Sequence, residues 1–155
     1  MIVPMNPNDL FYDDRKEPGM VSKQIGWQEK RGKVIIAFDK PCIYAHEKPK
    51  PSLGFFYDTL NRLVTHRFKI IDIVNDEQAC NYLNLKQQSD DWKREYLPPW
   101  REKLFEKSCE LPGKKQTWML ITDICELKDK KKLAYFGKKI CRSFVYSPKG
   151  SELTT

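Results

Sequence analysis

The chain has 155 residues, a length that suits one domain with a sizeable hydrophobic core. Hydrophobic residues make up 40% of it and aromatic residues 12%, which excludes a chain that is disordered along its length. No apolar run approaches the roughly 18 residues of a membrane span, and the N-terminus lacks the basic-then-apolar layout of a signal peptide. We therefore expect a cytoplasmic protein with no membrane contact.

Positive charge is concentrated near the C-terminus. Basic residues outnumber acidic ones by 28 to 21, and residues 101–155 contain 13 of the basic and 7 of the acidic residues. Such a surface attracts a phosphate backbone through counterion release, whatever the nucleotide sequence. A solvated lysine surface explains the same composition, and Lys128–Lys132 could simply be a soluble hairpin tip.

The first part of the chain favours short strands and turns. Ile2–Met5 predicts a short strand, and Asn6 before Pro7 is a good signal for the start of a helical turn. Lys33–Asp39 is rich in β-branched residues, which favours a core strand.

The next segments predict a loop and two further strands. Residues 40–52 contain three prolines and should form a loop, at a place where a binding rim would lie. Leu53–Asp58 predicts a strand that ends in a turn near Thr59–Arg62, and Leu63–Val74 predicts a long strand.

Helical patterns appear after this long strand. Residues 76–85, 90–96 and 100–109 favour helices, and Trp100 begins the apolar stripe of the third. The chain then returns to strand-like segments. Gln116–Leu127 predicts a core strand that contains Trp118, and 133–136 with 143–146 should close the sheet. The strands Lys33–Asp39, Leu63–Val74 and Gln116–Leu127 should share one sheet, with a common core of Phe38, Phe68, Ile70, Leu120 and Ile124. We expect one domain over residues 1–146, and Ser147–Thr155 as a tail or the start of a linker because it has no apolar pattern.

The order of these segments resembles the opening half of a known superfamily. The matching segments are the strand ending in Asn6-Pro7, the lone Trp27, the strand after Gly32-Lys33, the strand Leu63–Val74 and, later, Gln116–Ile124. In this order the chain is similar to PUA-like domains, especially the EVE and YTH type modules. The resemblance implies an α+β fold, in which a small curved β-sheet or PUA-like β-barrel flanked by helices holds one flipped, usually modified, nucleobase.

The resemblance also indicates a base pocket. Trp27 is the expected aromatic wall, with Asn6 and Asp39 reading the base edge and Trp100 shaping the rim. Each residue has a structural alternative: Trp27 could plug the barrel end, Asn6 could cap a helix, Asp39 could be a turn residue, and Trp100 could pack its helix onto the sheet. The expected phosphate-binding residues are Lys30, Arg31, Lys40, Lys114, Lys115, Lys130 and Lys131.

Catalytic and metal-binding patterns are absent from the sequence. The five cysteines are widely separated, and neither they nor the two histidines have zinc-ligand spacing. We expect Cys125 and Cys141 to be small core residues. There is no nucleophile elbow, phosphate-binding loop or deaminase signature, so we expect no enzyme activity, no cofactor and no metal.

Three functions remain open. The first is recognition of a modified base in DNA, the role of such modules in modification-dependent restriction systems of the McrB type, where a motor or nuclease is the partner. The second is recognition of a base in RNA, and the third is protein interaction with an incidental basic surface. We favour DNA because the segment order is closer to EVE-like modules than to RNA-modifying PUA domains.

Overall fold

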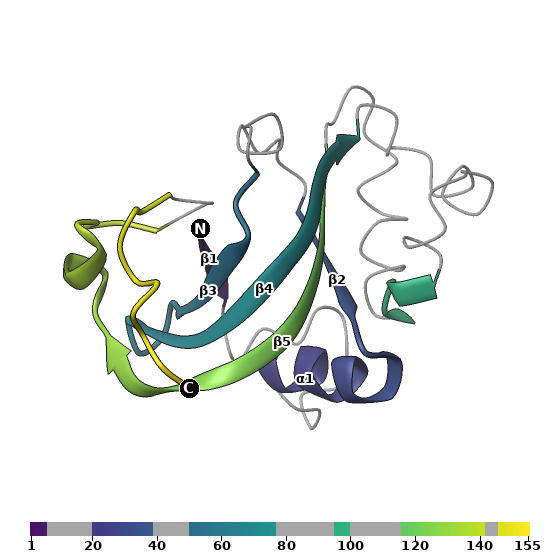
Figure 1. The fold of residues 1–155 in the computed structure, drawn as a ribbon, viewed down its shortest axis with the longest axis horizontal. Helices are drawn as coiled ribbons and strands as arrows, with labels where there is room; N and C mark the ends of the chain where they lie inside the picture. Colours follow the sequence, from purple (N-terminus) through teal and green to yellow (C-terminus); the bar gives the residue numbers. More distant parts are fainter. Residues whose placement is uncertain (6–19, 39–49, 77–94, 100–115, 142–145) are drawn as a thin grey trace.

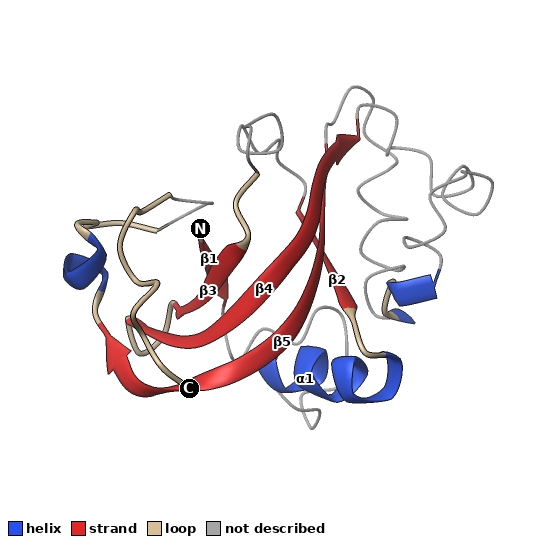
Figure 2. Cartoon of the chain, in the orientation of Figure 1, coloured by secondary structure: helices blue, strands red, loops and turns tan. Residues whose placement is uncertain are grey.

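The computed structural model describes residues 1–5, 20–38, 50–76, 95–99, 116–141 and 146–155; Figure 1 draws the other segments as a thin grey trace. The described elements, in chain order, are β1 (Ile2–Met5), α1 (Met20–Arg31), β2 (Val34–Phe38), β3 (Leu53–Asp58), β4 (Leu63–Asp76), β5 (Gln116–Lys131) and the 3-10 helix η2 (Leu133–Phe136). Figure 2 shows them as one curled layer of strands with α1 beside β5.

The strands form a five-stranded sheet in the order β1-β3-β4-β5-β2. β1 and β3 are parallel, whereas the three other neighbouring pairs are antiparallel. The long strands β4 and β5 curve together across the molecule, and their pairing shifts register at three places. Such irregularities increase local twist and bend a sheet. The expected α+β fold class with a small curved sheet is therefore confirmed.

Successive side chains of β2 and of β5 point to opposite faces of the sheet. Ile36 and Met119 belong to the largest core cluster, which also contains Phe68, Ile70 and Ile124. Trp118 and Leu120 belong to a second cluster with Ile35 and Leu97. The prediction that Trp118 is a core residue is confirmed, because its side chain is fully buried.

One part of the expected core was wrong. We expected Leu120 in the same cluster as Phe68, Ile70 and Ile124, but Leu120 lies in the second cluster. Successive residues of a strand point to opposite faces of the sheet. The register shifts between β4 and β5 interrupt this alternation, so Leu120 and Ile124 do not lie on the same face although they are four residues apart. The side chain of Phe38, the fifth expected member, lies outside the described side chains.

The chain after β5 also differs from expectation. Residues 133–136 form η2 and not a strand. The expected tail is in fact packed: Leu153 is buried, its carbonyl accepts a hydrogen bond from Arg67 Nη1 at 2.7 Å, and Lys128 N donates to Thr154 O at 3.1 Å. Leu153 fills a cluster with Leu133 and Phe136. A single apolar residue can anchor a segment that has no apolar periodicity. The strand expected at 143–146 and most of the helices expected between 76 and 109 lie outside the described residues.

Helix α1 contains a buried amide that has no hydrogen-bond partner in the described part of the chain. Gln24 is fully buried, and neither its Oε1 nor its Nε2 is satisfied there. Burying such a group costs about 1–3 kcal/mol. Gln24→Met keeps the side-chain length and removes both polar atoms, so the variant should be more stable by about 1–2 kcal/mol in urea unfolding.

Gln28 is the matched control for this prediction. It lies one turn later on α1, and its Oε1 accepts a hydrogen bond from Ile124 N at 2.8 Å. Gln28→Met should therefore destabilise the protein, because the buried backbone N–H of β5 loses its acceptor. Destabilisation by both substitutions would show that the Gln24 amide is satisfied in solution.

Candidate nucleic-acid interface

The last turn of α1 is fixed to β5 by hydrogen bonds. Ile124 N donates to Gln28 Oε1, and Thr122 Oγ1 donates to Gly32 O at 2.8 Å. The helix ends where Gly32 N donates to Gln28 O at 2.6 Å. On the inner side, Val21 and Ile25 pack against the largest core cluster. This arrangement leaves the C-terminal end of α1 in a defined position.

Trp27 lies at this end and is half-buried. Part of its side chain packs against the largest core cluster, and its Nε1–H donates to Tyr96 O at 3.1 Å. The Arg31 guanidinium lies over its ring at 5.3 Å from the centroid. Trp27 thus contributes to the packing of the fold, which is the kind of role that its structural alternative gave it. Part of its surface stays accessible.

A second cation–aromatic pair lies beside the first. The Lys33 ammonium is 5.3 Å from the ring centroid of Tyr96. Cation–aromatic contacts of this kind are worth about 0.5–1 kcal/mol at exposed sites. With the exposed Lys30 next to Arg31, these residues form what we call the α1 patch: Trp27, Lys30, Arg31, Lys33 and Tyr96.

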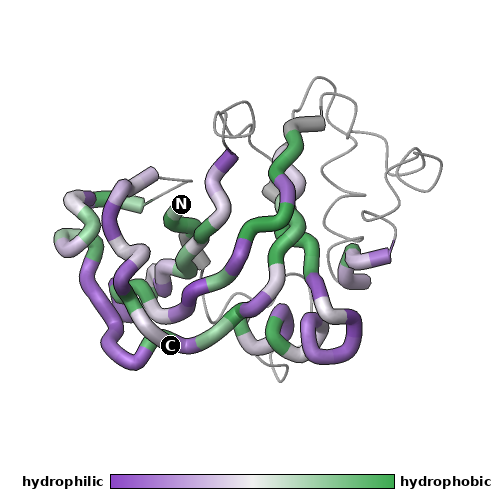
Figure 3. Tube along the Cα trace, in the orientation of Figure 1, coloured by the Kyte–Doolittle hydropathy of each residue, from purple (hydrophilic) through white to green (hydrophobic). Residues whose placement is uncertain are grey.

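The charges of the α1 patch also suit the helix itself. Lys30 and Arg31 are in the last turn of α1, where the helix dipole favours cations. Figure 3 shows a hydrophilic chain where α1 turns into β2, whereas hydrophilic and hydrophobic residues alternate along β4 and β5. The patch therefore offers three cations and two aromatic rings at one place on the surface.

Only part of the predicted site is brought together. Trp27, Lys30 and Arg31 share one end of α1. Lys33 and Tyr96 were missed. Lys33 could have been found from its place directly after the glycine that ends the helix, whereas Tyr96 is 69 residues from Trp27 and has no sequence signal. The other predicted residues Asn6, Asp39, Trp100, Lys40, Lys114 and Lys115 lie outside the described residues.

Lys130 and Lys131 lie elsewhere, near the end of β5, on the other side of the view in Figure 1. Lys130 forms an ion pair with Glu126 at 2.7 Å, and Lys131 pairs with Asp129 while lying over the Tyr135 ring. Both charges are partly neutralised. Four further lysines belong to this part of the chain, and we call them the lysine-rich end: Lys128, Lys132, Lys138 and Lys139. None of the four forms an ion pair with another described residue.

The same end contains a histidine with an altered pKa. His66 on β4 is half-buried, and its Nδ1 lies 2.8 Å from Thr65 Oγ1. Burial lowers the pKa of its imidazole below 6.5; a smaller raising effect of Glu126 and a lowering effect of Lys130 act in addition.

Acidification should therefore destabilise the protein below pH 6.5. The lowered pKa means that the unfolded chain binds a proton more readily than the folded one, so stability falls as pH drops from 6.5 toward the folded pKa. Melting temperatures between pH 7.5 and 5 should decline more steeply in the native protein than in His66→Gln. Parallel profiles would contradict the assignment. The pKa of Glu126 is lowered by Lys130, so protonation of Glu126 acts in a separate window below pH 4.5.

The two described cysteines differ in exposure. Cys141 is buried as expected, and burial raises the pKa of its thiol to about 12. Cys125 is exposed, so the expectation that it is a core residue was wrong; it follows Ile124 on β5 and therefore points to the opposite face. No group of three or more metal-ligating side chains occurs within the described ranges. None of the described helices is long and apolar enough to span a membrane.

Known proteins offer a weak likeness to this chain. No family model matches it, and no curated protein matches it at a significant level. Among solved structures, the chain is similar to the crystal structure of a mutant ZmASCH protein from Zymomonas mobilis, with a TM-score of 0.47 and 11% sequence identity. The alignment covers 86% of this chain and 73% of that chain. A likeness at this TM-score is too weak to indicate a function.

Proposed function

We propose that this chain is a PUA-like module that binds nucleic acid, with no catalytic role of its own. The observation that carries the proposal is the α1 patch, where Arg31 and Lys33 lie against the rings of Trp27 and Tyr96. Cations next to aromatic rings suit both parts of a nucleic acid. The cations attract phosphates, and the accessible ring surfaces can stack with bases.

The finer part of the proposal is the ligand. We propose that the module recognises a modified base in DNA, in the first place a methylated one, flipped into a pocket of which Trp27 is one wall and Asn6, Asp39 and Trp100 are further members. Extruding a base loses a few kcal/mol of stacking and pairing, which an aromatic wall offsets in part. DNA is favoured over RNA by the segment order, and a motor or nuclease is the proposed partner.

The first test measures the salt dependence of binding. Binding of labelled duplex and single-stranded oligonucleotides is followed by fluorescence anisotropy at increasing salt. The triple variant Lys30→Gln, Arg31→Gln, Lys33→Gln should flatten the slope of log affinity against log salt, by about 0.9 for each duplex phosphate that the protein no longer neutralises. Affinity at low salt should fall with it.

An exposed cation away from the patch supplies the control. Arg62 is in the turn between β3 and β4, at the end of β4 that pairs with the end of β5. Arg62→Gln should leave the slope nearly unchanged. If the native protein binds no nucleic acid at low salt, the proposed function is wrong.

A panel of ligands tests the finer part. Duplexes and single strands carrying N6-methyladenine, 5-methylcytosine or 5-hydroxymethylcytosine are compared with unmodified DNA and RNA. Preference for one modified DNA supports the proposal. Preference for RNA would keep the nucleic-acid function and reject the DNA assignment.

A further inference from the structure

A cleft of about 470 Å³ lies away from the α1 patch, between the start of β3 and the C-terminal segment. Residues 50–53 and Phe55 line it on the β3 side, together with Met1, whose N-terminal ammonium donates to Leu53 O, and residues 146–149 and Ser151 line it from the C-terminal segment. We call it the C-terminal cleft. Its volume is within the range of about 300–1,000 Å³ that is typical of small-molecule sites.

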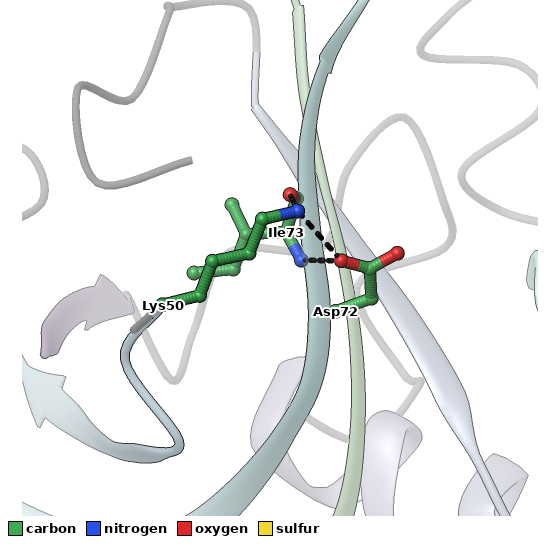
Figure 4. A network of polar contacts seen from close by, with 3 residues as sticks. All are labelled: Lys50, Asp72 and Ile73. Carbon is green, nitrogen blue, oxygen red and sulfur yellow. Dashed lines mark hydrogen bonds and ion pairs between the residues drawn. The ribbon is translucent and has the colours of Figure 1, made fainter. Parts of the chain in front are cut away.

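The wall on the side of β3 is held in place by Lys50. Its Nζ donates to Asp72 Oδ1 at 2.9 Å and to Ile73 O at 2.8 Å, and Asp72 Oδ1 also accepts from Ile73 N (Figure 4). This network connects the segment before β3 to β4. It also occupies the Lys50 ammonium, so the Lys50 charge is already compensated.

The opposite wall is fixed by Gly150 and Ser147. Gly150 has φ of +110°, and a Cβ there would lie 2.6 Å from Phe136 Cε1 and 3.1 Å from Phe55 Cζ. Only glycine fits this close approach in this conformation. Ser147 Oγ donates to Phe136 O at 2.9 Å and accepts from Lys149 N at 3.1 Å. Contacts to Asp72, Ile73 and Phe136, which do not line the cleft, help to hold both walls, as expected of a preformed site.

Exposed groups in the cleft combine an aromatic ring with a cation. Tyr146 is 47% exposed although it is a large aromatic residue. Lys149 is exposed, while Ser52 and Ser151 add exposed hydroxyl groups. The pKa of the Glu152 carboxyl is lowered by its hydrogen bond with Tyr135 and, to a smaller extent, by the charge of Lys149. The nearby Glu152 carboxylate accepts from Tyr135 OH and Gly150 N. A tyrosine ring and a lysine that line the same cleft suit a planar ring that carries a phosphate.

Further positive charge is anchored next to the cleft. Phe136 contacts the cleft-lining Phe55 at 5.4 Å between ring centroids, and Cys141 Sγ lies 3.9 Å from Ile2 O. Residues 137–140 connect these two anchors and include Lys138 and Lys139 of the lysine-rich end. Ile140 in the same segment is 60% exposed.

We infer that the C-terminal cleft is a nucleotide-binding site, in which Tyr146 stacks on the base, Lys149 contacts the phosphate, and Lys138 and Lys139 attract neighbouring phosphates. This site is separate from the α1 patch. A free nucleotide and a nucleotide within a single strand share this chemistry. Tyrosine stacking is sequence-tolerant because every base presents an aromatic face.

The test titrates the full chain with the four ribonucleoside monophosphates, the matching nucleosides and a ten-residue oligothymidylate, using isothermal calorimetry. Tyr146→Ala should weaken binding of the monophosphates or the oligonucleotide about tenfold, within the range for loss of one stacked base. Tyr146→Phe keeps the ring and should bind within about twofold of the native protein. Lys149→Gln should weaken monophosphates but not nucleosides. Unchanged melting curves show that the exposed substitutions leave the fold intact.

The outcomes separate this inference from the proposed function. Monophosphate binding that Tyr146→Ala weakens identifies a free nucleotide as the ligand. Oligonucleotide binding that Tyr146→Ala weakens, without monophosphate binding, identifies a strand, because the α1 patch also binds strands but does not contain Tyr146. Equal affinities of native protein and Tyr146→Ala for every ligand, or no saturable binding of any of them, overturn the inference. The Lys30, Arg31 and Lys33 triple variant should keep monophosphate binding, so loss of duplex binding in that variant tests the α1 patch independently.

Discussion

Gly54→Ala should destabilise the protein by about 3 kcal/mol, at the upper end of the usual cost of overpacking a core. Gly54 on β3 pairs with Phe68 on β4, and a Cβ at Gly54 would lie only 2.1 Å from Phe68 Cε2 and 2.3 Å from its Cζ. Phe68 is fully buried and packs on Phe56 at 4.5 Å between ring centroids, so it has no free space to enter. Urea unfolding followed by circular dichroism gives the free energy of unfolding.

Two variants show that the clash with Phe68 is the cause. Gly26 in α1 has no atom within 4 Å of the position that an alanine methyl group would take, so Gly26→Ala should stabilise by about 0.5–1 kcal/mol through helix propensity. Phe68→Leu removes the ring edge, so adding Gly54→Ala to it should cost much less than in the native protein. Additive losses in the double variant would contradict the clash.

Trp27→Ala should reduce both stability and base discrimination. Trp27 is half-buried and donates a hydrogen bond to Tyr96 O, so its removal should cost about 2 kcal/mol, roughly half of the 3–5 kcal/mol for a fully buried tryptophan. If the accessible part of the ring stacks on the flipped base, preference for the modified base should also fall, since one stacking contact is worth about 1–3 kcal/mol. A melting curve and a binding ratio on the same sample measure both effects.

Trp27→Phe separates packing from the hydrogen bond. Phenylalanine keeps an aromatic face but cannot donate to Tyr96 O, so it should retain most of the discrimination while losing part of the stability. Lower stability of Trp27→Ala with unaltered discrimination would assign Trp27 to packing alone. The base-reading role would then be left to Asn6 and Asp39, without this wall.

Local pattern was sufficient for most strands. The predicted Leu53–Asp58 agrees with β3, and β2, β4 and β5 lie where β-branched and alternating segments predicted them. A strand that is buried on one or both faces of a sheet needs apolar residues at regular positions. This pattern is visible in the sequence, so the strand can be predicted from it. The ends were less predictable: β4 and β5 run two and four residues beyond the expected Val74 and Leu127. Pairing between the two strands continues where sequence pattern no longer favours it.

Helix α1 was missed because its apolar side is narrow. Val21 and Ile25 pack inward, but polar Gln24 and Gln28 share that side, so the period of a helix is masked. The buried Gln24 amide has no hydrogen-bond partner among the described residues, and Gln28 Oε1 accepts a hydrogen bond from the backbone N–H of Ile124 on β5. An amphipathic pattern is judged from residue types alone. It therefore does not identify glutamine side chains that face the sheet.

The sequence by itself determined the α+β class, the positions of the strands and the presence of basic and aromatic residues suited to a nucleic acid. These properties follow from local composition and from the two-residue period of strands. Only the tertiary structure decided which of these residues meet. Trp27 reaches Tyr96 across 69 residues, and Gly150 lies against Phe55 and Phe136 because the C-terminal segment folds back. Contacts between residues so distant in the chain depend on the path of the backbone. A periodic sequence pattern does not indicate that path.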